Sequence, residues 1–167
     1  MLIPLLGGKV SEAFSPLDPR SKWLTFSVTA SRWLNDHTPL GSVLAMGDRA
    51  GALAYLTDRP IVQREGIVNS KRDLNAVENE QVPAFLAARY VSYVIDWTSA
   101  TNPMPASVPG APGCRPYPFT LGTGRRSGSL VLCDRDRVYA ANLHGELLSV
   151  WRYRSALQAR AASTLSG

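Results

Sequence analysis

Apolar positions near the start of the chain recur at helical spacing. Asp18-Pro19 favours a helix start, because Asp can cap free N–H groups and Pro fits the first helical turn. The apolar residues that follow share one helical face and are Trp23, Phe26, Ala30, Trp33 and Leu34. Pro39-Leu40-Gly41 then ends the helix. The pattern therefore predicts an amphipathic helix that packs one face against a core.

Three short apolar runs follow and predict buried strands over 42–46, 59–63 and 90–97. A short helix over 50–56 separates the first two runs, and a helical pattern over 73–89 separates the second from the third. Pro83 breaks that second pattern or begins a new helix there. Helices that alternate with buried strands imply a parallel sheet with right-handed crossovers.

The second half of the chain has a different pattern. Six prolines and five glycines fall within 102–128, which predicts a long loop of functional or mobile character. Runs over 129–133 and 137–142 predict an antiparallel hairpin that turns at Asp134-Arg135-Asp136. A last strand is expected over 146–154, after the turn at His144-Gly145.

The fold predicted from these elements is one α/β domain over residues 1–167. Its sheet is expected to be mainly parallel and flanked by helices, in a Rossmann-like three-layer arrangement with antiparallel C-terminal edge strands. The length and the 45% hydrophobic content suit a single domain with a core. Residues 1–17 are expected to form an extension and residues 155–167 a frayed tail.

Charge and hydropathy narrow the possible partners. The net charge of +5 is spread along the chain without a dense basic run or interleaved aromatic residues, which argues against nucleic-acid binding. No run approaches the roughly 18 apolar residues of a membrane-spanning helix. The apolar start at 1–8 lacks a basic segment and a cleavage site, so the chain itself is expected to be soluble, without an export signal.

Two cysteines, Cys114 and Cys133, allow two interpretations. In a reducing cytosol they are unrelated buried thiols, whereas in an oxidising compartment they can close a loop. Spacing alone does not decide, because a disulfide depends on geometry.

The strongest candidate for chemistry is the turn Gly47-Asp48-Arg49-Ala50-Gly51, between a predicted strand and a predicted helix. Ligands of open α/β sheets bind at such positions, but the turn matches neither G-x-G-x-x-G nor a P-loop. The structural alternative is a turn in which Asp48 caps the short helix. Glu65 follows the next predicted strand, so Asp48 and Glu65 can bind a cation or act as acid and base. Alternatively, Arg49, Arg64 or Lys71 neutralise the two carboxylates.

Other side chains that could carry chemistry have a plainer explanation. His37 and His144 show no ligand spacing, so no metal site is predicted, and no G-x-S-x-G elbow is present. No cofactor is predicted either. Asp134 and Asp136 fit turn chemistry better than acid–base chemistry. The tryptophans are expected to be core or partly buried anchors rather than a sugar-stacking platform.

Five short phrases resemble a known family. Trp33-Leu34 with Thr38-Pro39 is similar to its W-L-x-x-x-T-P phrase, and Asp48 with 51–55 is similar to D-x-G-A-L-A-Y. The later matches are Glu65-Gly66-Ile67-Val68-Asn69 to G-L-V-N, Leu86 with Tyr93-Val94-Ile95 to the helix-strand phrase, and Val150-Trp151-Arg152-Tyr153 to the terminal strand. The family is the soluble C-terminal domain of bacterial GT-C-type membrane glycosyltransferases, which are relatives of the protein mannosyltransferases.

The resemblance implies a periplasmic or otherwise extracytoplasmic domain that does not itself transfer sugar. The membrane-spanning body is absent from this chain, and with it the acidic loop residue that the family uses for catalysis. Gln63-Arg64-Glu65 also replaces the Asp-Leu pair common before the glycine. Residues 1–8 would then be the tail of a last membrane helix, and the setting would permit a disulfide between Cys114 and Cys133.

The expected role is to help position an acceptor or a lipid-linked sugar beside the membrane-spanning portion of a parent glycosyltransferase. No catalytic residue is assigned to this chain. The expected binding face, with the 102–128 loop as a candidate lid, holds Asp48, Arg49, Glu65, Asn69 and Arg72. Three alternatives stay open: a stand-alone small-molecule or nucleotide-binding protein, a metal-dependent hydrolase that uses Asp48 and Glu65, and a purely structural or partner-binding domain.

Overall fold

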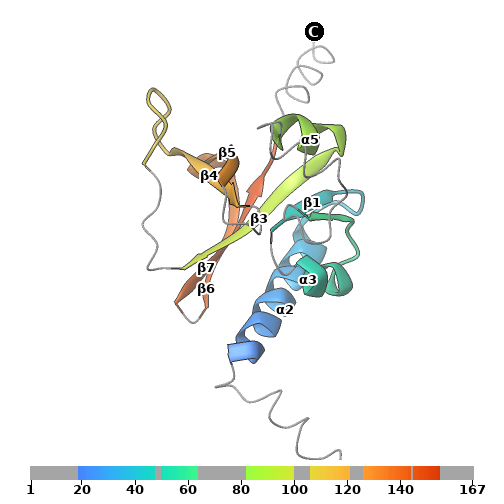
Figure 1. Ribbon diagram of the computed structural model, residues 1–167. Helices are drawn as coiled ribbons and strands as arrows, with labels where there is room; N and C mark the ends of the chain where they lie inside the picture. The colour runs from blue at the N-terminus through green and yellow to red at the C-terminus, as the bar shows by residue number, and fades with distance from the viewer. Residues whose placement is uncertain are drawn as a thin grey trace, which may run out of the picture.

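The computed structural model describes residues 19–47, 50–63, 82–99, 106–120, 126–143 and 145–154. Its helices and strands follow one another in an order close to the expected one (Figure 1). In chain order they are α2 (Pro19–His37), β1 (Val43–Met46), α3 (Ala50–Leu56), β2 (Ile61–Gln63), α5 (Val82–Ala88), β3 (Val91–Ser99), β4 (Cys114–Thr120), β5 (Arg126–Cys133), the 3-10 turn η1 (Asp134–Asp136), β6 (Arg137–Leu143) and β7 (Glu146–Arg152). None of these helices is both long and apolar enough to cross a membrane.

The larger sheet has the strand order β2-β1-β3-β7-β6. β1 pairs in parallel with β2 and with β3, whereas β7 pairs antiparallel with β3 and with β6. The α/β class, the parallel pairing of the first three strands and the antiparallel C-terminal strands are therefore confirmed. The sheet as a whole is mixed, because two of its four pairings are antiparallel.

Both faces of this sheet are covered. Successive residues of a strand point to opposite faces, and the buried side chains divide into two clusters accordingly. Leu44 packs in the cluster that includes α2 and α3, while its neighbour Ala45 packs in the cluster that includes α5, β4 and β5. The β4–β5 ribbon thus lies across the sheet from α2 and α3 (Figure 1).

The prediction of a hairpin between 129–133 and 137–142 is wrong. β5 pairs with β4 in a separate two-stranded sheet, whereas β6 pairs with β7. The predicted turn residues form η1, which carries the chain from one sheet to the other. Leu130 and Leu132 of β5 are buried in the cluster that contains Trp151, so burial against the larger sheet decides the pairing.

The prediction of a loop over 102–128 is wrong for two segments, because β4 and the start of β5 lie there. Two prolines of β4, Pro116 and Pro118, stand at alternate positions and have no N–H to donate. A strand tolerates this when one of its edges is open, as in a two-stranded ribbon. The predicted extension over 1–17 and the tail over 155–167 lie outside the described residues.

A helix, α5, begins at Val82, next to Pro83, where the sequence allowed either a break or a new start. The rest of the helical pattern over 73–81 lies outside the described residues. α2, β1, α3 and β2 lie at or within two residues of their predicted bounds. The local signals for these four elements are thus confirmed.

A buried hydrogen-bond network joins the end of α2 to the start of β2. The side chain of Arg59 is only 5% exposed. Its Nη2 donates to the backbone oxygens of Asn35 (3.1 Å) and Thr38 (2.7 Å), and its Nε donates to Thr38 Oγ1 (3.2 Å). The carbonyls at a helix C-terminus carry partial negative charge, so they are suitable partners for a buried cation.

Asn35 extends this network to the end of α3. Its Oδ1 accepts hydrogen bonds from the Thr57 hydroxyl (2.9 Å) and from the backbone N–H of Asp58 (3.3 Å). Its Nδ2 donates to the backbone oxygen of Leu56 at 3.4 Å. The network, which we call the α2–β2 junction, consists of Asn35, Thr38, Thr57 and Arg59.

We expect Arg59→Ala to lower the free energy of unfolding by about 2–4 kcal/mol, because it leaves buried carbonyl oxygens without donors. Arg32→Ala on the exposed side of α2 is the matched control, and its effect should stay within about 0.5 kcal/mol. Urea unfolding of both variants measures the difference. Equal stabilities of the two variants would contradict a structural role for the α2–β2 junction.

Candidate functional site

The carboxyl ends of β1 and β2 lie side by side in the sheet. Met46, the last residue of β1, pairs with Gln63, the last residue of β2, and on its other side with Ile95 of β3. The predicted residues Asp48 and Glu65 follow these paired ends by two positions each. The predicted face itself, made of Asp48, Arg49, Glu65, Asn69 and Arg72, lies outside the described residues.

The order β2-β1-β3 means that the chain leaves β1 toward one neighbour and later returns on its other side. α3, which precedes β2, packs on one face of the sheet, and α5, which precedes β3, packs on the opposite face. In open α/β sheets, ligands bind outside the carboxyl ends of strands at such a switch point. Buried Gly47, directly after β1, marks this position, which we call the carboxyl edge.

α2 runs antiparallel to β1 and begins at the carboxyl edge. Its end is held at the amino end of β2 by Arg59, whereas Phe26, near its start, contacts Trp97 near the end of β3 (ring centroids 6.1 Å apart). Figure 1 shows the start of α2 and the end of β3 at the same end of the molecule. The chain therefore enters the described fold beside the carboxyl edge.

Three of the four tryptophans pack in or against the hydrophobic core, as expected. Trp151 is buried and packs edge-on against Tyr117, while Trp97 and Trp33 are half-buried. Trp33 stacks on Tyr139 (4.7 Å) and on His37 (4.9 Å). This confirms the anchor role for three of the four; the side chain of Trp23 lies outside the described part.

His37 bonds through Nδ1 to the backbone oxygen of Trp33 at 2.9 Å, besides its stacking contact. Among the residues that the structure places, no group of three or more His, Cys, Asp or Glu side chains is arranged to hold a metal ion. His144 falls outside those residues.

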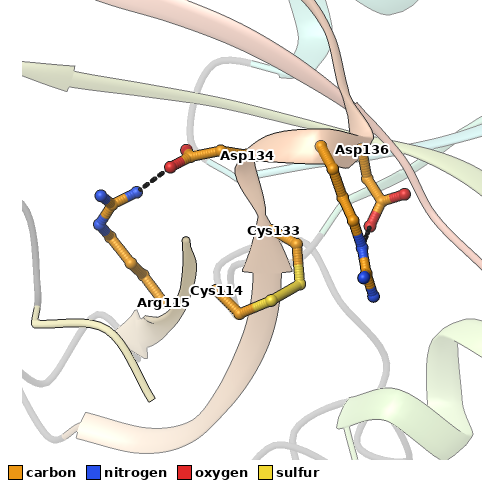
Figure 2. The surroundings of a disulfide bond; sticks show 6 residues. Cys114, Arg115, Cys133, Asp134 and Asp136 are labelled. Atoms are coloured by element: carbon orange, nitrogen blue, oxygen red, sulfur yellow. Dashed lines mark hydrogen bonds and ion pairs between the residues drawn. A yellow bond between two sulfur atoms is a disulfide. The ribbon is translucent and has the colours of Figure 1, made fainter. Parts of the chain in front are cut away.

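Cys114 and Cys133 form a disulfide (Figure 2). They face one another in the β4–β5 ladder, with their Cα atoms 3.9 Å apart. The structure therefore selects the bonded alternative, which the sequence left open. Beside the bridge, Arg115 Nη1 donates to Asp134 Oδ2 at 2.7 Å, and the Asp134 N–H donates to the Gly113 oxygen at 2.8 Å. The bridge and these contacts hold the start of η1 against β4.

A cavity of about 340 Å³ lies between η1, β5 and the end of β7. Arg135, Arg152 and Arg154 contribute to its lining, with Asp136, Tyr153 and Cys133. The sequence analysis did not identify this site. The signal was the alternation Trp151-Arg152-Tyr153-Arg154, which turns two buried aromatic rings to one side of an extended segment and two exposed arginines to the other.

No family model, curated protein or solved structure that we compared with this chain matches it significantly.

The disulfide should stabilise the fold by about 3 kcal/mol, as expected for a bridge between residues 19 apart in the sequence. We expect Cys114→Ala/Cys133→Ala to lose this amount in urea unfolding. Protein prepared without reductant should show no thiol that reacts with a maleimide after unfolding. Two reactive thiols in unfolded protein exported to the periplasm would contradict the assigned bond.

Alkaline pH should destabilise the protein. Burial, aided by the nearby Asp96 carboxylate, raises the pKa of Tyr117 above its ordinary value of 10.0, and burial also raises the pKa of Tyr153. The unfolded chain therefore loses these protons first, so stability falls as the pH rises above about 10. The free energy of unfolding should fall less steeply with rising pH in Tyr117→Phe than in the control Tyr55→Phe. Tyr55 is 90% exposed. Identical slopes would contradict this assignment.

Proposed function

We propose that this chain is the extracytoplasmic, non-catalytic domain of a GT-C-type membrane glycosyltransferase. Its carboxyl edge helps to position an acceptor or a lipid-linked sugar. The observation that carries the proposal is the placement of the start of α2 beside the carboxyl edge. A membrane segment that preceded α2 would bring this edge, rather than the opposite end of the sheet, toward the membrane.

Four of the five phrases that resemble the family contribute buried residues to one hydrophobic cluster. These residues are Leu34 of the first phrase, Leu53 of the second, Tyr93 and Ile95 of the fourth and Val150 of the fifth. Phrases that share one buried cluster fit a structural motif of a common fold better than chance matches of scattered residues. This supports the resemblance independently of the individual residue matches.

The disulfide supports the proposed extracytoplasmic location. Structural disulfides persist in the periplasm and outside cells, and they are rare in a reducing cytosol. The Cys114–Cys133 bond closes the β4–β5 ribbon, whose strands have no other partner among the described strands. An extracytoplasmic domain can rely on such a bond throughout its lifetime.

The strand order supports a Rossmann-like interpretation of the first half of the chain. Three parallel strands with helices on alternate faces form the beginning of a doubly wound sheet. In this proposal, Asp48 and Glu65 accept hydrogen bonds from sugar hydroxyls, and Arg49 and Arg72 pair with a lipid phosphate. Asn69 adds a neutral amide donor and acceptor.

The first test is the size and location of the protein in its own cell. With an epitope tag placed after residue 167 at the chromosomal locus, we expect a product far larger than 18.1 kDa. It should stay with the membranes after carbonate extraction, and external protease should reach the tag. A product of 18.1 kDa plus the mass of the tag, found in the soluble fraction, would refute the parent glycosyltransferase and favour a stand-alone binding protein.

The carboxyl edge is tested in the full-length enzyme. Asp48→Ala/Glu65→Ala should raise the KM for acceptor or lipid-linked sugar roughly tenfold with a smaller change in kcat, as expected from lost binding contacts. Asp58→Ala, at an exposed side chain before β2, is the matched control and should leave both constants unchanged. A KM that the double substitution leaves unchanged, with stability also unchanged, would refute the positioning role.

A further inference from the structure

The cavity between η1 and β7 contains more positive charge than its own residues neutralise. Among the described residues that line it are three arginines, Arg135, Arg152 and Arg154, and one acidic residue, Asp136. Arg135 Nε lies 3.8 Å from Asp136 Oδ2, which is an ion pair too long for a hydrogen bond. Within the described part of the chain, no hydrogen bond or ion pair engages the guanidinium of Arg152 or Arg154.

The other nearby carboxylate is directed elsewhere. Asp134 and Asp136 extend to opposite sides of η1, and Asp134 is bonded to Arg115 (Figure 2). Asp134 is also not among the lining residues of the cavity. Among the described residues, the lining of the cavity therefore contains more arginine than carboxylate.

From this arrangement we propose that the cavity binds a soluble anion of the phosphate class. Arginine presents a planar fork of donors that matches phosphate oxygens, and like charges brought together are stabilised when an anion sits between them. A volume of about 340 Å³ admits a phosphate or diphosphate group with part of the molecule that carries it. Val131, Leu132, Cys133 and Tyr153 also contribute to the lining.

The backbone segments on both sides of the cavity are fixed by contacts to the rest of the fold. The N–H of Tyr153 donates to the Ser92 oxygen at 2.7 Å, and Arg152 pairs with Tyr93 of β3, so the end of β7 is fixed to the sheet. On the other wall, Cys133 is the last residue of β5 and directly precedes η1, and its disulfide to Cys114 fixes this position. Arg135 and Arg152 therefore reach the cavity from two elements whose backbones are fixed independently.

The source of the phosphate follows from the position of the cavity. Arg152 pairs near the start of β3, whereas the carboxyl edge lies beyond Ile95, toward the end of β3. The cavity is thus at the opposite end of the sheet from the edge where α2 begins. A soluble ligand reaches this position in any setting, so the inference does not depend on the proposed function.

Calorimetric titration of the whole chain with sodium pyrophosphate, at neutral pH and low ionic strength, tests the site. We expect saturable single-site binding that Arg152→Gln/Arg154→Gln weakens by at least roughly tenfold. The control Arg32→Gln/Arg137→Gln removes the same charge from two exposed arginines outside the cavity lining and should leave the affinity within about twofold. Equal losses in both variants, or no saturable binding by the unsubstituted chain, would overturn the proposal.

A second variant changes the affinity in the opposite direction and does not depend on weakened binding. Asp136→Asn removes the single carboxylate of the cavity, so pyrophosphate should bind several-fold more tightly. Reduction of the disulfide should weaken binding, since it releases the strand before η1. Binding that is weaker in Asp136→Asn than in the unsubstituted chain would overturn the proposal even if the arginine variants failed to fold.

Vesicles distinguish a soluble phosphate from a lipid headgroup. Phosphatidylglycerol vesicles should bring down the chain and its Arg152→Gln/Arg154→Gln variant to the same extent. Sedimentation that is lost in this variant, without pyrophosphate binding by the unsubstituted chain, would overturn the proposal in favour of a membrane surface. Failure of either arm leaves the tagged-protein test of the parent glycosyltransferase unaffected.

Discussion

The arrangement of the first half of the molecule depends on the buried guanidinium of Arg59. A buried charge is costly unless its environment compensates it. Here, within the described residues, the compensation comes from the carbonyl oxygens of Asn35 and Thr38 and from the Thr38 hydroxyl, with no carboxylate in contact. Because these acceptors exist only where α2 ends, the guanidinium fixes the end of the helix at the amino end of β2.

The rest of the sheet follows from that constraint. With its end fixed, α2 lies along one face of the sheet, where Phe26, Ala30 and Leu34 are buried. The opposite face is then covered by α5 and the β4–β5 ribbon. A two-stranded ribbon is marginally stable alone. Here it gains stability from the disulfide and from burying Tyr117, Leu130 and Leu132 against the cluster that contains Trp151.

The two ends of the sheet differ in what they offer a ligand. The carboxyl edge lies where parallel strands end and the connections diverge, a place that favours ligands in α/β proteins for topological reasons. The other end, where β7 finishes, offers charge instead: three arginines and one carboxylate around one cavity. A sequence whose basic residues are scattered can therefore still concentrate positive charge locally, because Arg135 and Arg152 come from separate elements.

The sequence by itself determined the elements whose signals are local. Asp18-Pro19, Pro39-Leu40-Gly41, Gly47 and Pro83 stand at or next to element boundaries, and the order of helix and strand in the first half predicted the parallel pairing of β1, β2 and β3. The strand over Glu146–Arg152 was also predictable from its apolar residues and from the turn that precedes it. The position of Asp48 and Glu65 after two adjacent strands followed from the same order.

Only the tertiary structure decided the second half. The nearest partner of β5 in sequence is β6, and local turn signals favoured that pairing. Burial of Leu130 and Leu132 against the larger sheet and the bridge to Cys114 selected β4 instead. The arginine-lined cavity was equally hidden, since Arg135 and Arg152 lie 17 positions apart and line one cavity because Arg137, directly after η1, pairs with Trp151 of β7. Hydrophobic periodicity shows which residues are buried, but which buried surfaces meet depends on long-range packing.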